Sequence, residues 1–318
     1  MALEHLKDIS VDVIIPVYKP DNKLYQLLVK MERQTIKPKN IFILQTVTEM
    51  NRKEKLEIPS DYNIDIQISY IDKEDFDHGG TRKFGASLSN ADILMYMTQD
   101  AIPVDDFLIE RLIEPYEDSL VSATYARQLA NSNADIIERY TRSFNYPKKS
   151  STKSVSDIET LGIKAFFCSN VCSTYRRDIY EKLGGFVDKT IFNEDMIMAH
   201  AMIHAGFRIA YQAKAKVVHS HLYSCLQQFS RNFDLGVSHR QYANVFLGVS
   251  SEAEGVRLVK STIKYLVDNK EYLLIPDLII NSGMKYLGYK LGVNYNKLPM
   301  SVVIRCTMNK GYWKKSNK

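Results

Sequence analysis

Short apolar runs alternate with amphipathic segments over the first hundred residues. The runs are rich in Val, Ile and Leu, which is typical of buried β-strands. They lie at residues 11–17, 41–47, 64–71 and 93–97. Residues 22–34 carry Leu and Met at helical spacing, and a glycine-rich turn at 77–81 leads into a second helix. This alternation predicts an α/β fold with a mostly parallel sheet flanked by helices.

The pattern continues less regularly to residue 221. We expect helices at 105–116, from 178 and at 194–205, and strands at 121–127, 166–175, 208–211 and 216–219. Residues 131–160 are polar, and we expect a mobile loop beside a helix there. Long segments rich in Tyr and Lys follow. The sequence therefore predicts two domains, an α/β domain at 1–222 and a helical, basic C-terminal extension at 223–318.

The composition is that of a soluble globular protein. The chain has 318 residues, of which 45% are hydrophobic and 25% charged, and no apolar run is long enough to span a bilayer. Residues 1–8 have neither the basic nor the apolar part of a signal peptide. The four cysteines are scattered and read as reduced. We therefore expect a cytoplasmic protein.

Positive charge is concentrated at the C-terminal end. The net charge is +5, but residues 222–318 hold 14 Lys and Arg against 6 Asp and Glu, and residues 297–318 contain no acid. Residues 272–293 mix apolar and Tyr side chains with lysines, and Trp313 stands among lysines. Such a tail is either solvated or binds an anionic partner such as a membrane surface. Nucleic acid is not expected, because residues 1–221 are net acidic. The helices would alternatively pack on the first domain or form a homodimer.

The loop after the first strand excludes two classes of nucleotide-binding protein. Residues 16–20 contain no glycine, whereas a dinucleotide fold or a P-loop needs glycines for close backbone approach to phosphates. Dehydrogenase and ATPase functions are therefore not expected. A sugar-nucleotide pyrophosphorylase, which would also have a glycine-rich first loop, becomes a weak alternative.

Four later positions carry candidate chemistry, and each also has an ordinary structural explanation. Asp100 follows a strand and would bind a cation or sugar, or cap a helix. Residues 77–83, with Arg82 and Lys83, suit a diphosphate, or form a plain turn before a surface helix. The pair Glu194-Asp195 would supply a general base or complement a helix dipole. His219, with His221 beside it, would be a ligand or a buried, hydrogen-bonded histidine.

The order of these segments resembles the inverting family 2 glycosyltransferases of the GT-A fold. It is most similar to bacterial rhamnosyltransferases that build O-antigen and rhamnose-containing cell-wall polysaccharide. The segments that carry the resemblance are VDVIIPVYKP (11–20), FDHGGTRKFGASLSNADILMYMTQDAIP (76–103), FFCSNVCSTYRRDIYEKLGGF (166–186), NEDMIMAHAMIHAGFRIAY (193–211) and VVHSH (217–221). They cover about residues 10–222, so the resemblance implies that 1–222 is a GT-A catalytic domain.

The resemblance implies roles for individual residues. It makes Asp195 the catalytic base and places Asn170, Gly185 and Glu194 on the acceptor side. The implied donor-binding residues are Pro16, Tyr18, Asp72, His78, Gly80, Arg82, Gln99 and Asp100. The family's D-x-D motif is reduced here to Thr98-Gln99-Asp100. Binding of a divalent metal, Mn²⁺ or Mg²⁺, therefore rests on Asp100 with His219.

The implied reaction is transfer of L-rhamnose from dTDP-rhamnose to a lipid-linked saccharide in cell-surface polysaccharide synthesis. Such an enzyme would lie peripherally on the inner face of the cell membrane, through its basic C-terminal region. Three alternatives stay open. The donor would be UDP-galactose or UDP-N-acetylglucosamine, the protein would bind sugar nucleotides without catalysis, or the tail would make it a basic adaptor.

Overall fold

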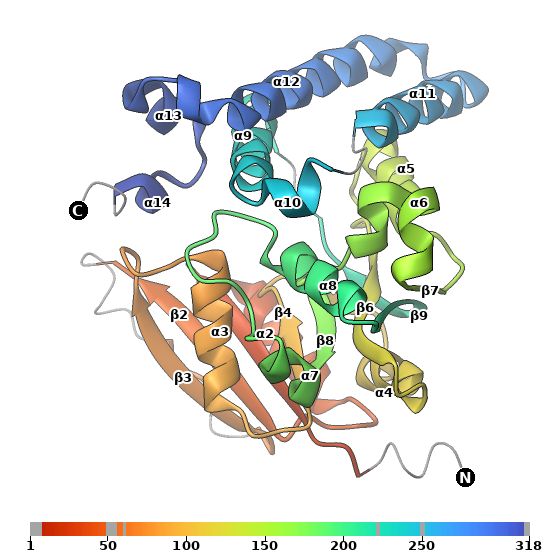
Figure 1. Cartoon of the computed structure of the whole chain (residues 1–318). Helices are drawn as coiled ribbons and strands as arrows, with labels where there is room; N and C mark the ends of the chain where they lie inside the picture. Colours follow the sequence, from red (N-terminus) through yellow and green to blue (C-terminus); the bar gives the residue numbers. More distant parts are fainter. Residues whose placement is uncertain (1–7, 49–55, 60–61, 221–222, 249–251, 315–318) are drawn as a thin grey trace.

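The computed structural model describes residues 8–48, 56–59, 62–220, 223–248 and 252–314. Within these residues, nine strands form one sheet flanked by helices, and a helical part follows it (Figure 1). The expected α/β class with a helical extension is confirmed.

The first hundred residues fold as the apolar pattern predicts. The elements are β1 (Val11–Tyr18), α2 (Asn22–Glu32), β2 (Asn40–Val47), β3 (Asp65–Asp72), α3 (His78–Leu88) and β4 (Ile93–Met97). Asp77 caps α3, since its side chain accepts a hydrogen bond from the Gly80 N–H group. The glycine-rich turn is therefore also the first turn of a helix.

The second half of the α/β part holds shorter elements. They are β5 (Ile102–Pro103), α4 (Leu108–Ile113), β6 (Val121–Leu129), α5 (Ile136–Asn145), β7 (Ser151–Lys153), α6 (Ile158–Leu161), β8 (Cys172–Arg176), α7 (Arg177–Lys182), α8 (Glu194–His204) and β9 (Arg208–Val218). Single 3₁₀ turns lie at Glu114–Glu117, Val155–Asp157 and Gly162–Phe166.

The prediction of a mobile loop at 131–160 is wrong. This region contains α5, α6 and the strand β7, which pairs with β9. Lys153, in the lysine-rich stretch, is buried, and its ammonium group donates hydrogen bonds to the carbonyl oxygens of Lys164 and Phe167. The polar composition suggested a loop, but backbone carbonyl oxygens satisfy the ammonium group of Lys153, so this charged side chain lies inside the fold.

Two predicted strand boundaries also differ. The strand expected at 166–175 begins only at Cys172, because Phe166 ends a 3₁₀ turn and packs against His200 of α8. The two strands expected at 208–211 and 216–219 are one continuous strand, β9. Its pairing register with β6 shifts between Ala126 and Arg127, whose partners on β9 are Gln212 and Lys216. The residues between these two partners lie in the gap between the two strands that were expected from the sequence.

The sheet order is β3-β2-β1-β4-β8-β6-β9-β5, with β7 also paired to β9. The pairs β1–β2, β2–β3, β1–β4 and β6–β9 are parallel, and the other pairs are antiparallel, so the sheet is mixed. Because β8 runs antiparallel to both β4 and β6, those two strands point the same way. The carboxyl ends of β1, β4, β6 and β9 therefore share one edge of the sheet.

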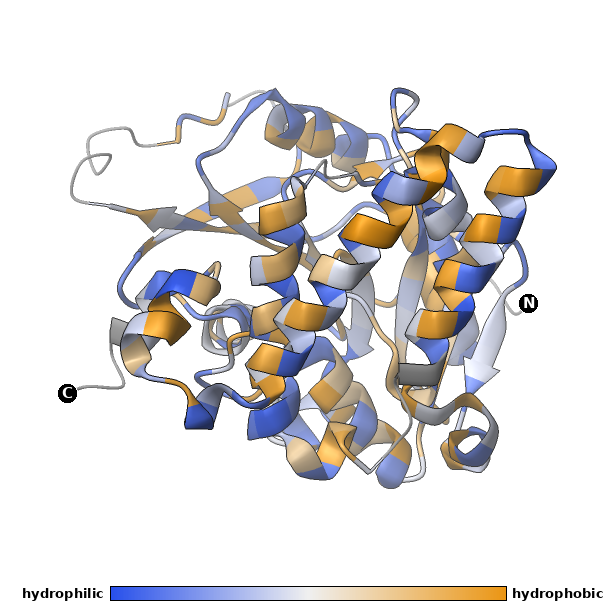
Figure 2. Cartoon of the chain, turned by 90° about the horizontal axis from the view of Figure 1, so that it is seen from above, coloured by the Kyte–Doolittle hydropathy of each residue, from blue (hydrophilic) through white to orange (hydrophobic). Residues whose placement is uncertain are grey.

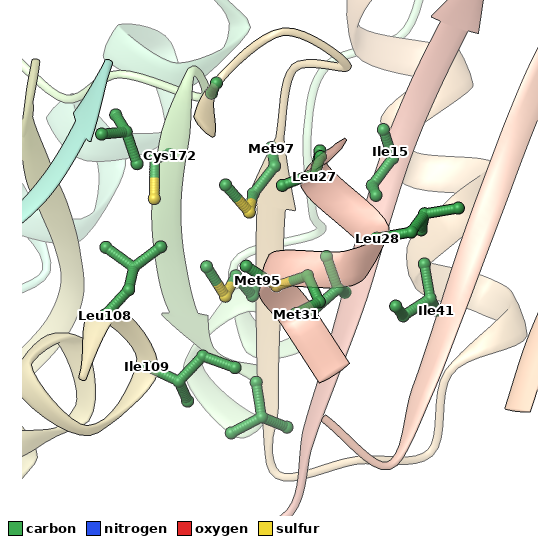
Figure 3. Close-up of a cluster of buried hydrophobic side chains, with 14 of the residues drawn as sticks. Ile15, Leu27, Leu28, Met31, Ile41, Met95, Met97, Leu108, Ile109 and Cys172 are labelled. Carbon is green, nitrogen blue, oxygen red and sulfur yellow. The ribbon is translucent and has the colours of Figure 1, made fainter. Parts of the chain in front are cut away.

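Alternate residues of the central strands enter two cores, one on each face of the sheet. Val13 and Ile15 of β1 face α2 and α4, whereas Ile14 between them packs on the side of α3, α7 and α8. Figure 3 shows the first core, in which Leu27 and Leu28 of α2 lie over the strands. Burial on both faces explains why these strands read as continuous apolar runs.

The C-terminal part is helical. Its helices are α9 (Cys225–Gln241), α10 (Ala243–Phe246), α11 (Glu252–Asp268), α12 (Ile275–Val293), α13 (Met300–Cys306) and α14 (Lys310–Lys314), with 3₁₀ turns at Tyr272–Leu274 and Tyr295–Lys297. The helices α9 and α12 cross at glycines: a Cβ atom on Gly292 would lie 2.0 Å from the Phe233 carbonyl oxygen. Within the described residues, no helix is long and apolar enough to cross a bilayer.

The extension packs directly on the α/β part. Ile191, from the loop before α8, shares a buried cluster with Phe233, Val237, Val303 and Trp313. The alternative that the C-terminal helices dock on the first part is therefore confirmed for these helices. The division into separate domains at residue 222 stays a prediction.

Candidate active site

The shared edge of the sheet brings the predicted site residues together. Gln99 and Asp100 follow β4, Gln128 is the last residue but one of β6, and His219 follows β9. Because β8 runs in the opposite direction, the residues before it, including Asn170, reach the same edge. Residues far apart in the sequence therefore meet at the carboxyl ends of parallel strands, where α/β proteins bind ligands.

A pocket of about 400 Å³ opens at this edge. The predicted donor-binding residues that line it are Pro16, Tyr18, His78, Arg82, Gln99 and Asp100. Its remaining lining residues were not among the predicted donor-binding residues, although Thr98 belongs to the reduced D-x-D motif: Val17, Asp21, Lys23, Thr46, Phe76 and Thr98. Asp72 and Gly80 do not line this pocket. The Asp72 carbonyl oxygen instead accepts hydrogen bonds in the turn after β3, and the donor-binding roles of both residues stay predictions.

Hydrogen bonds to its backbone and to its hydroxyl group fix Tyr18 at the edge of the pocket. Its backbone N–H donates a 2.8 Å hydrogen bond to Oε1 of Gln99, and its hydroxyl accepts one of 3.0 Å from Nζ of Lys73. The hydrogen bond and the charge of Lys73 lower the pKa of the Tyr18 hydroxyl. A ring fixed in this way can stack on a planar ligand. Lys73 was missed because nothing in the sequence pairs it with Tyr18.

Arg82 and Glu194 form a buried ion pair. An Nη atom of Arg82 lies 3.1 Å from Oε1 of Glu194, and Nδ2 of Asn170 donates a 3.0 Å hydrogen bond to the same oxygen. Burial opposes the ionisation of Glu194, but the charge of Arg82 prevails and holds the pKa of this carboxyl below its usual value. Burial lowers the pKa of the neighbouring His78 to about 4, so this imidazole is neutral at pH 7.

Asp195 has the opposite electrostatic environment. Its Oδ2 accepts a 3.1 Å hydrogen bond from the Asn170 backbone, and its Oδ1 accepts one of 2.8 Å from the Met196 backbone. Burial and the adjacent Glu194 carboxylate raise the pKa of Asp195 to about 7. Asp195 is half-buried and is not among the residues that line the pocket around Tyr18. A carboxylate with such a pKa can accept a proton from a bound hydroxyl near neutral pH.

Asp100 and His219 face each other across the edge of the pocket. Nε2 of His219 lies 3.6 Å from Oδ1 of Asp100. Its Nδ1 lies 3.2 Å from Oε1 of Gln128, an oxygen that also accepts a hydrogen bond from Arg142. Since this oxygen only accepts, Nδ1 carries a proton, and the neutral form of the ring directs its Nε2 lone pair towards Asp100. Gln128 was missed because it reads as an ordinary strand residue.

This arrangement fits a divalent cation. A metal-binding histidine commonly donates its other ring N–H to a nearby oxygen, as His219 does to Gln128. Among the described residues, no third His, Cys, Asp or Glu joins Asp100 and His219. A site with two protein ligands suits Mn²⁺ or Mg²⁺, which takes its other ligands from phosphate oxygens and water. His221, the second predicted histidine, lies outside the described residues.

Residues 12–184 match Glycosyl transferase family 2. The chain belongs to this family. It is therefore a glycosyltransferase, as the resemblance in the sequence implied. It is 39% identical over 308 residues to the O-antigen chain rhamnosyltransferase RfbN of Salmonella typhimurium, which covers 96% of both chains. It is 37% identical to the O-antigen chain rhamnosyltransferase WbaN of Salmonella anatum over the same shares.

Solved structures show the same fold. The mannosyltransferase PcManGT from Pyrobaculum calidifontis, in complex with GDP-Man and Mn²⁺, superposes with a TM-score of 0.55 at 13% identity, over 93% of this glycosyltransferase and 79% of that chain. TarS 1-349 of S. aureus, in complex with UDP-GlcNAc, gives a TM-score of 0.52 at 11% identity, over 91% and 92% of the two chains. The predicted GT-A-type fold of the glycosyltransferase is confirmed.

On the predicted acceptor side, the glycosyltransferase brings Asn170 and Glu194 together beside Asp195. Gly185 lies further along the chain, in a turn with φ of +72°, and a Cβ atom there would lie 3.1 Å from the ring of Tyr180. This turn explains the glycine without a substrate. Its role at the acceptor stays a prediction.

The C-terminal extension of the glycosyltransferase also supports the turn that precedes Glu194 and Asp195. The Ser238 hydroxyl, on α9, donates a 2.8 Å hydrogen bond to the carbonyl oxygen of Phe192 and accepts one of 3.3 Å from Asn193. Asn193 has a φ of +67° and directs the chain into α8, which begins with Glu194 and Asp195. The position of Glu194 and Asp195 therefore depends on a helix that no sequence motif had connected with the site.

Proposed function

We propose that this glycosyltransferase moves L-rhamnose from dTDP-rhamnose to a lipid-linked saccharide, with inversion at the anomeric carbon. The observation that carries this proposal is the resemblance to two O-antigen chain rhamnosyltransferases over almost the whole of both chains. The match includes the C-terminal helices, which supply contacts to the turn that precedes Glu194 and Asp195. The reaction would serve the synthesis of a cell-surface polysaccharide.

In the proposed reaction, Asp195 is the general base. The acceptor hydroxyl oxygen attacks the anomeric carbon while its proton passes to the Asp195 carboxylate. The bond between the anomeric carbon and the phosphate oxygen breaks, and the nucleoside diphosphate leaves with the electron pair. Asn170 holds Asp195 by its backbone N–H, and the negative charge of Glu194 raises the affinity of Asp195 for the proton.

The proposed donor site is the pocket around Tyr18. Its ring would stack on the nucleobase, and Lys23 would approach the phosphates. Asp100 and His219 would hold Mn²⁺ or Mg²⁺, which when bound offsets the negative charge of the departing diphosphate. Relatives of the fold were solved with GDP-Man and with UDP-GlcNAc, so a UDP-sugar is the alternative donor.

The test is nucleotide release from dTDP-rhamnose, UDP-galactose, UDP-N-acetylglucosamine and GDP-mannose, with and without Mn²⁺ or Mg²⁺. We expect selective release from dTDP-rhamnose, loss of release in Asp195→Asn, and no change in the exposed control Asp178→Asn. Release from another donor would overturn the proposed sugar and keep the mechanism. Binding of a nucleotide sugar without release, even with acceptor lipid extracts, would favour a non-catalytic binding protein.

We propose that the enzyme reaches its lipid-linked acceptor by lying on the anionic inner face of the membrane. Exposed apolar side chains gather on the turn at Tyr272–Leu274, where Leu273 is 93% exposed, and along one side of α12. On α12 they are Ile279, Ile280, Tyr286, Leu287 and Leu291. This helix lies nearest the viewer in Figure 2 and carries hydrophobic residues along its length. An apolar strip on a basic part of the chain fits an anionic bilayer.

The predicted membrane contact of Trp313 needs a correction. This side chain is 4% exposed and packs against Tyr295, with ring centroids 5.3 Å apart. It therefore belongs to the interface between the helices and the α/β part. A homodimer through α12 is the competing use of the same apolar strip, and the molecular mass in solution distinguishes the two.

A further inference from the structure

Arg231, on α9, lies beside the turn that precedes Glu194 and Asp195. Its guanidinium carbon is 4.6 Å from the centre of the Phe192 ring and 5.8 Å from that of Tyr223. Phe192 also neighbours His78 of the donor pocket, with ring centroids 5.9 Å apart. Two residues after Phe192 the chain begins α8 with Glu194 and Asp195. Arg231 therefore contacts a ring that neighbours the donor pocket, and its charge interacts with those of His78 and Asp195.

Among the described residues, no carboxylate forms an ion pair with Arg231, although its charge interacts with those of Asp195 and Asp234 over a longer distance. The Arg231 side chain is half-buried, yet within the described part of the chain it has no hydrogen bond and no ion pair, only the two ring contacts. Asp234, on the same helix, is already bound by the Thr307 hydroxyl and by the backbone N–H groups of Met308 and Asn309. A partly desolvated, unpaired guanidinium is costly in the free protein, and an anionic ligand would offset that cost.

Other cations increase the positive potential around Arg231. Burial lowers the pKa of the Lys285 ammonium on α12, and repulsion by the charge of Arg231 lowers it further. Arg142 adds to the same repulsion. The acidic group whose charge attracts Arg231 is Asp195. Because its pKa is raised to about 7, Asp195 is partly protonated at pH 7. In contrast, Arg82 in the donor pocket is already paired with Glu194.

We infer that Arg231 binds a diphosphate at the reacting centre, so that the C-terminal extension supplies a substrate-binding cation to the GT-A part. A guanidinium stacked on an aromatic ring keeps its N–H edge free, and this edge matches two phosphate oxygens. The diphosphate belongs either to the nucleotide donor or to the lipid-linked acceptor. The inference rests on the proposed function for the identity of both substrates.

Equilibrium binding tests the inference without turnover. The probes are dTDP against dTMP, with Mg²⁺, and farnesyl diphosphate against farnesyl monophosphate at saturating dTDP. Arg231→Ala is expected to weaken one of the two diphosphates on the order of 10- to 100-fold, the loss of one charge-assisted contact, and its monophosphate less. Arg231→Lys should recover part of the loss. Arg240→Ala, an exposed arginine on the same helix, is the control.

The two pairs of probes distinguish the diphosphate of the nucleotide donor from that of the lipid-linked acceptor. A loss for dTDP assigns Arg231 to the donor, and a loss for farnesyl diphosphate with unchanged dTDP binding assigns it to the acceptor. Both diphosphates binding within twofold of wild type would overturn the inference, as would a wild-type protein that binds neither diphosphate better than its monophosphate. If UDP rather than dTDP binds, the proposed donor fails, and the comparison of UDP with UMP still tests Arg231. Thermal unfolding checks that each variant is folded.

Discussion

The Arg82 guanidinium lies 3.1 Å from Oε1 of Glu194, and the two side chains are only 8% and 6% exposed. This pair joins the start of α3 to the start of α8. It keeps Glu194 ionised, and the resulting negative charge next to Asp195 raises the pKa of Asp195. A structural ion pair and a proton acceptor are thus coupled through adjacent residues.

Glu194→Gln should therefore have two effects. Arg82 would become a buried charge without its partner, so the free energy of unfolding should fall by about 3–5 kcal/mol. The pKa of Asp195 should also fall, because the neighbouring negative charge is gone. Denaturant unfolding measures the first effect and the acid limb of kcat/KM the second. Glu181→Gln breaks an exposed ion pair with Arg177 and should change stability by less than about 1 kcal/mol. An unshifted acid limb in Glu194→Gln would contradict the electrostatic coupling.

The raised pKa of Asp195 predicts how activity and stability depend on pH. As the proposed base, Asp195 must be ionised, so kcat/KM should rise through about pH 7 and then level off. The folded protein holds this proton up to about pH 7, whereas an unfolded aspartate releases it near pH 4. Stability contributed by the protonated group is therefore present below about pH 4 and lost as the pH rises to 7.

Asp195→Asn isolates this contribution. The amide cannot ionise, so at pH 8 the variant should be more stable than wild type by about 1–3 kcal/mol while losing transfer activity. Unfolding curves at pH 5 and pH 8 give the comparison, and the advantage should shrink at the lower pH. A variant less stable than wild type at pH 8 would show that the carboxylate is better solvated than its surroundings indicate.

The sequence predicted the parts of the site that follow single strands, and missed those that depend on tertiary pairing. Asp100 and His219 could be placed because apolar runs end just before them. The Arg82–Glu194 pair could not, since it depends on the packing of α8 beside α3. Gln128 became visible only when β8 was found between β4 and β6, which aligns the ends of strands that are distant in sequence. Arg231 needed the docking of α9, for which periodicity gives no signal.

Gln128→Leu should weaken metal binding through His219. The variant removes the oxygen that fixes the Nδ1 proton, so Nε2 no longer presents its lone pair in a fixed direction. Loss of such a supporting contact typically costs about 10–100-fold in metal affinity. Mn²⁺ titration followed by electron paramagnetic resonance, with dTDP present, measures it. Gln67→Leu, on the exposed side of β3, is the control. Equal Mn²⁺ affinity in both variants would remove Gln128 from the metal site.

Gly292→Ala should disturb the close crossing of α9 and α12. A methyl group at this position would meet the Phe233 carbonyl oxygen at 2.0 Å, so the helices must separate, at a cost of about 1–3 kcal/mol in unfolding free energy. Because α9 also holds the turn before Glu194, activity should fall as well. Gly283→Ala is the matched control on α12: a Cβ atom there meets nothing within 4 Å, and helix propensity favours alanine. Equal stability of the two variants would contradict the rigid crossing.

Membrane contact through α12 can be separated from contact through the basic tail. Deletion of residues 297–318 would remove Trp313 and break its buried cluster, so loss of binding in that variant would have two explanations. Substitution on the apolar strip avoids this problem, because Leu273 and Ile280 are exposed, at 93% and 61%, and their replacement leaves the cluster intact.

We therefore expect the double variant Leu273→Asp, Ile280→Asp to lose most binding to vesicles containing phosphatidylglycerol in co-sedimentation. Burial of an aliphatic side chain contributes about 1.5–3 kcal/mol, and the added carboxylates are repelled by the anionic surface, so the partition coefficient should fall more than 100-fold. Val155→Asp changes an apolar residue of the α/β part that is 54% exposed, and this control should bind like wild type. If the double variant still sediments with vesicles but a wild-type dimer becomes monomeric, the strip is a subunit interface, and the acceptor must be reached by another surface.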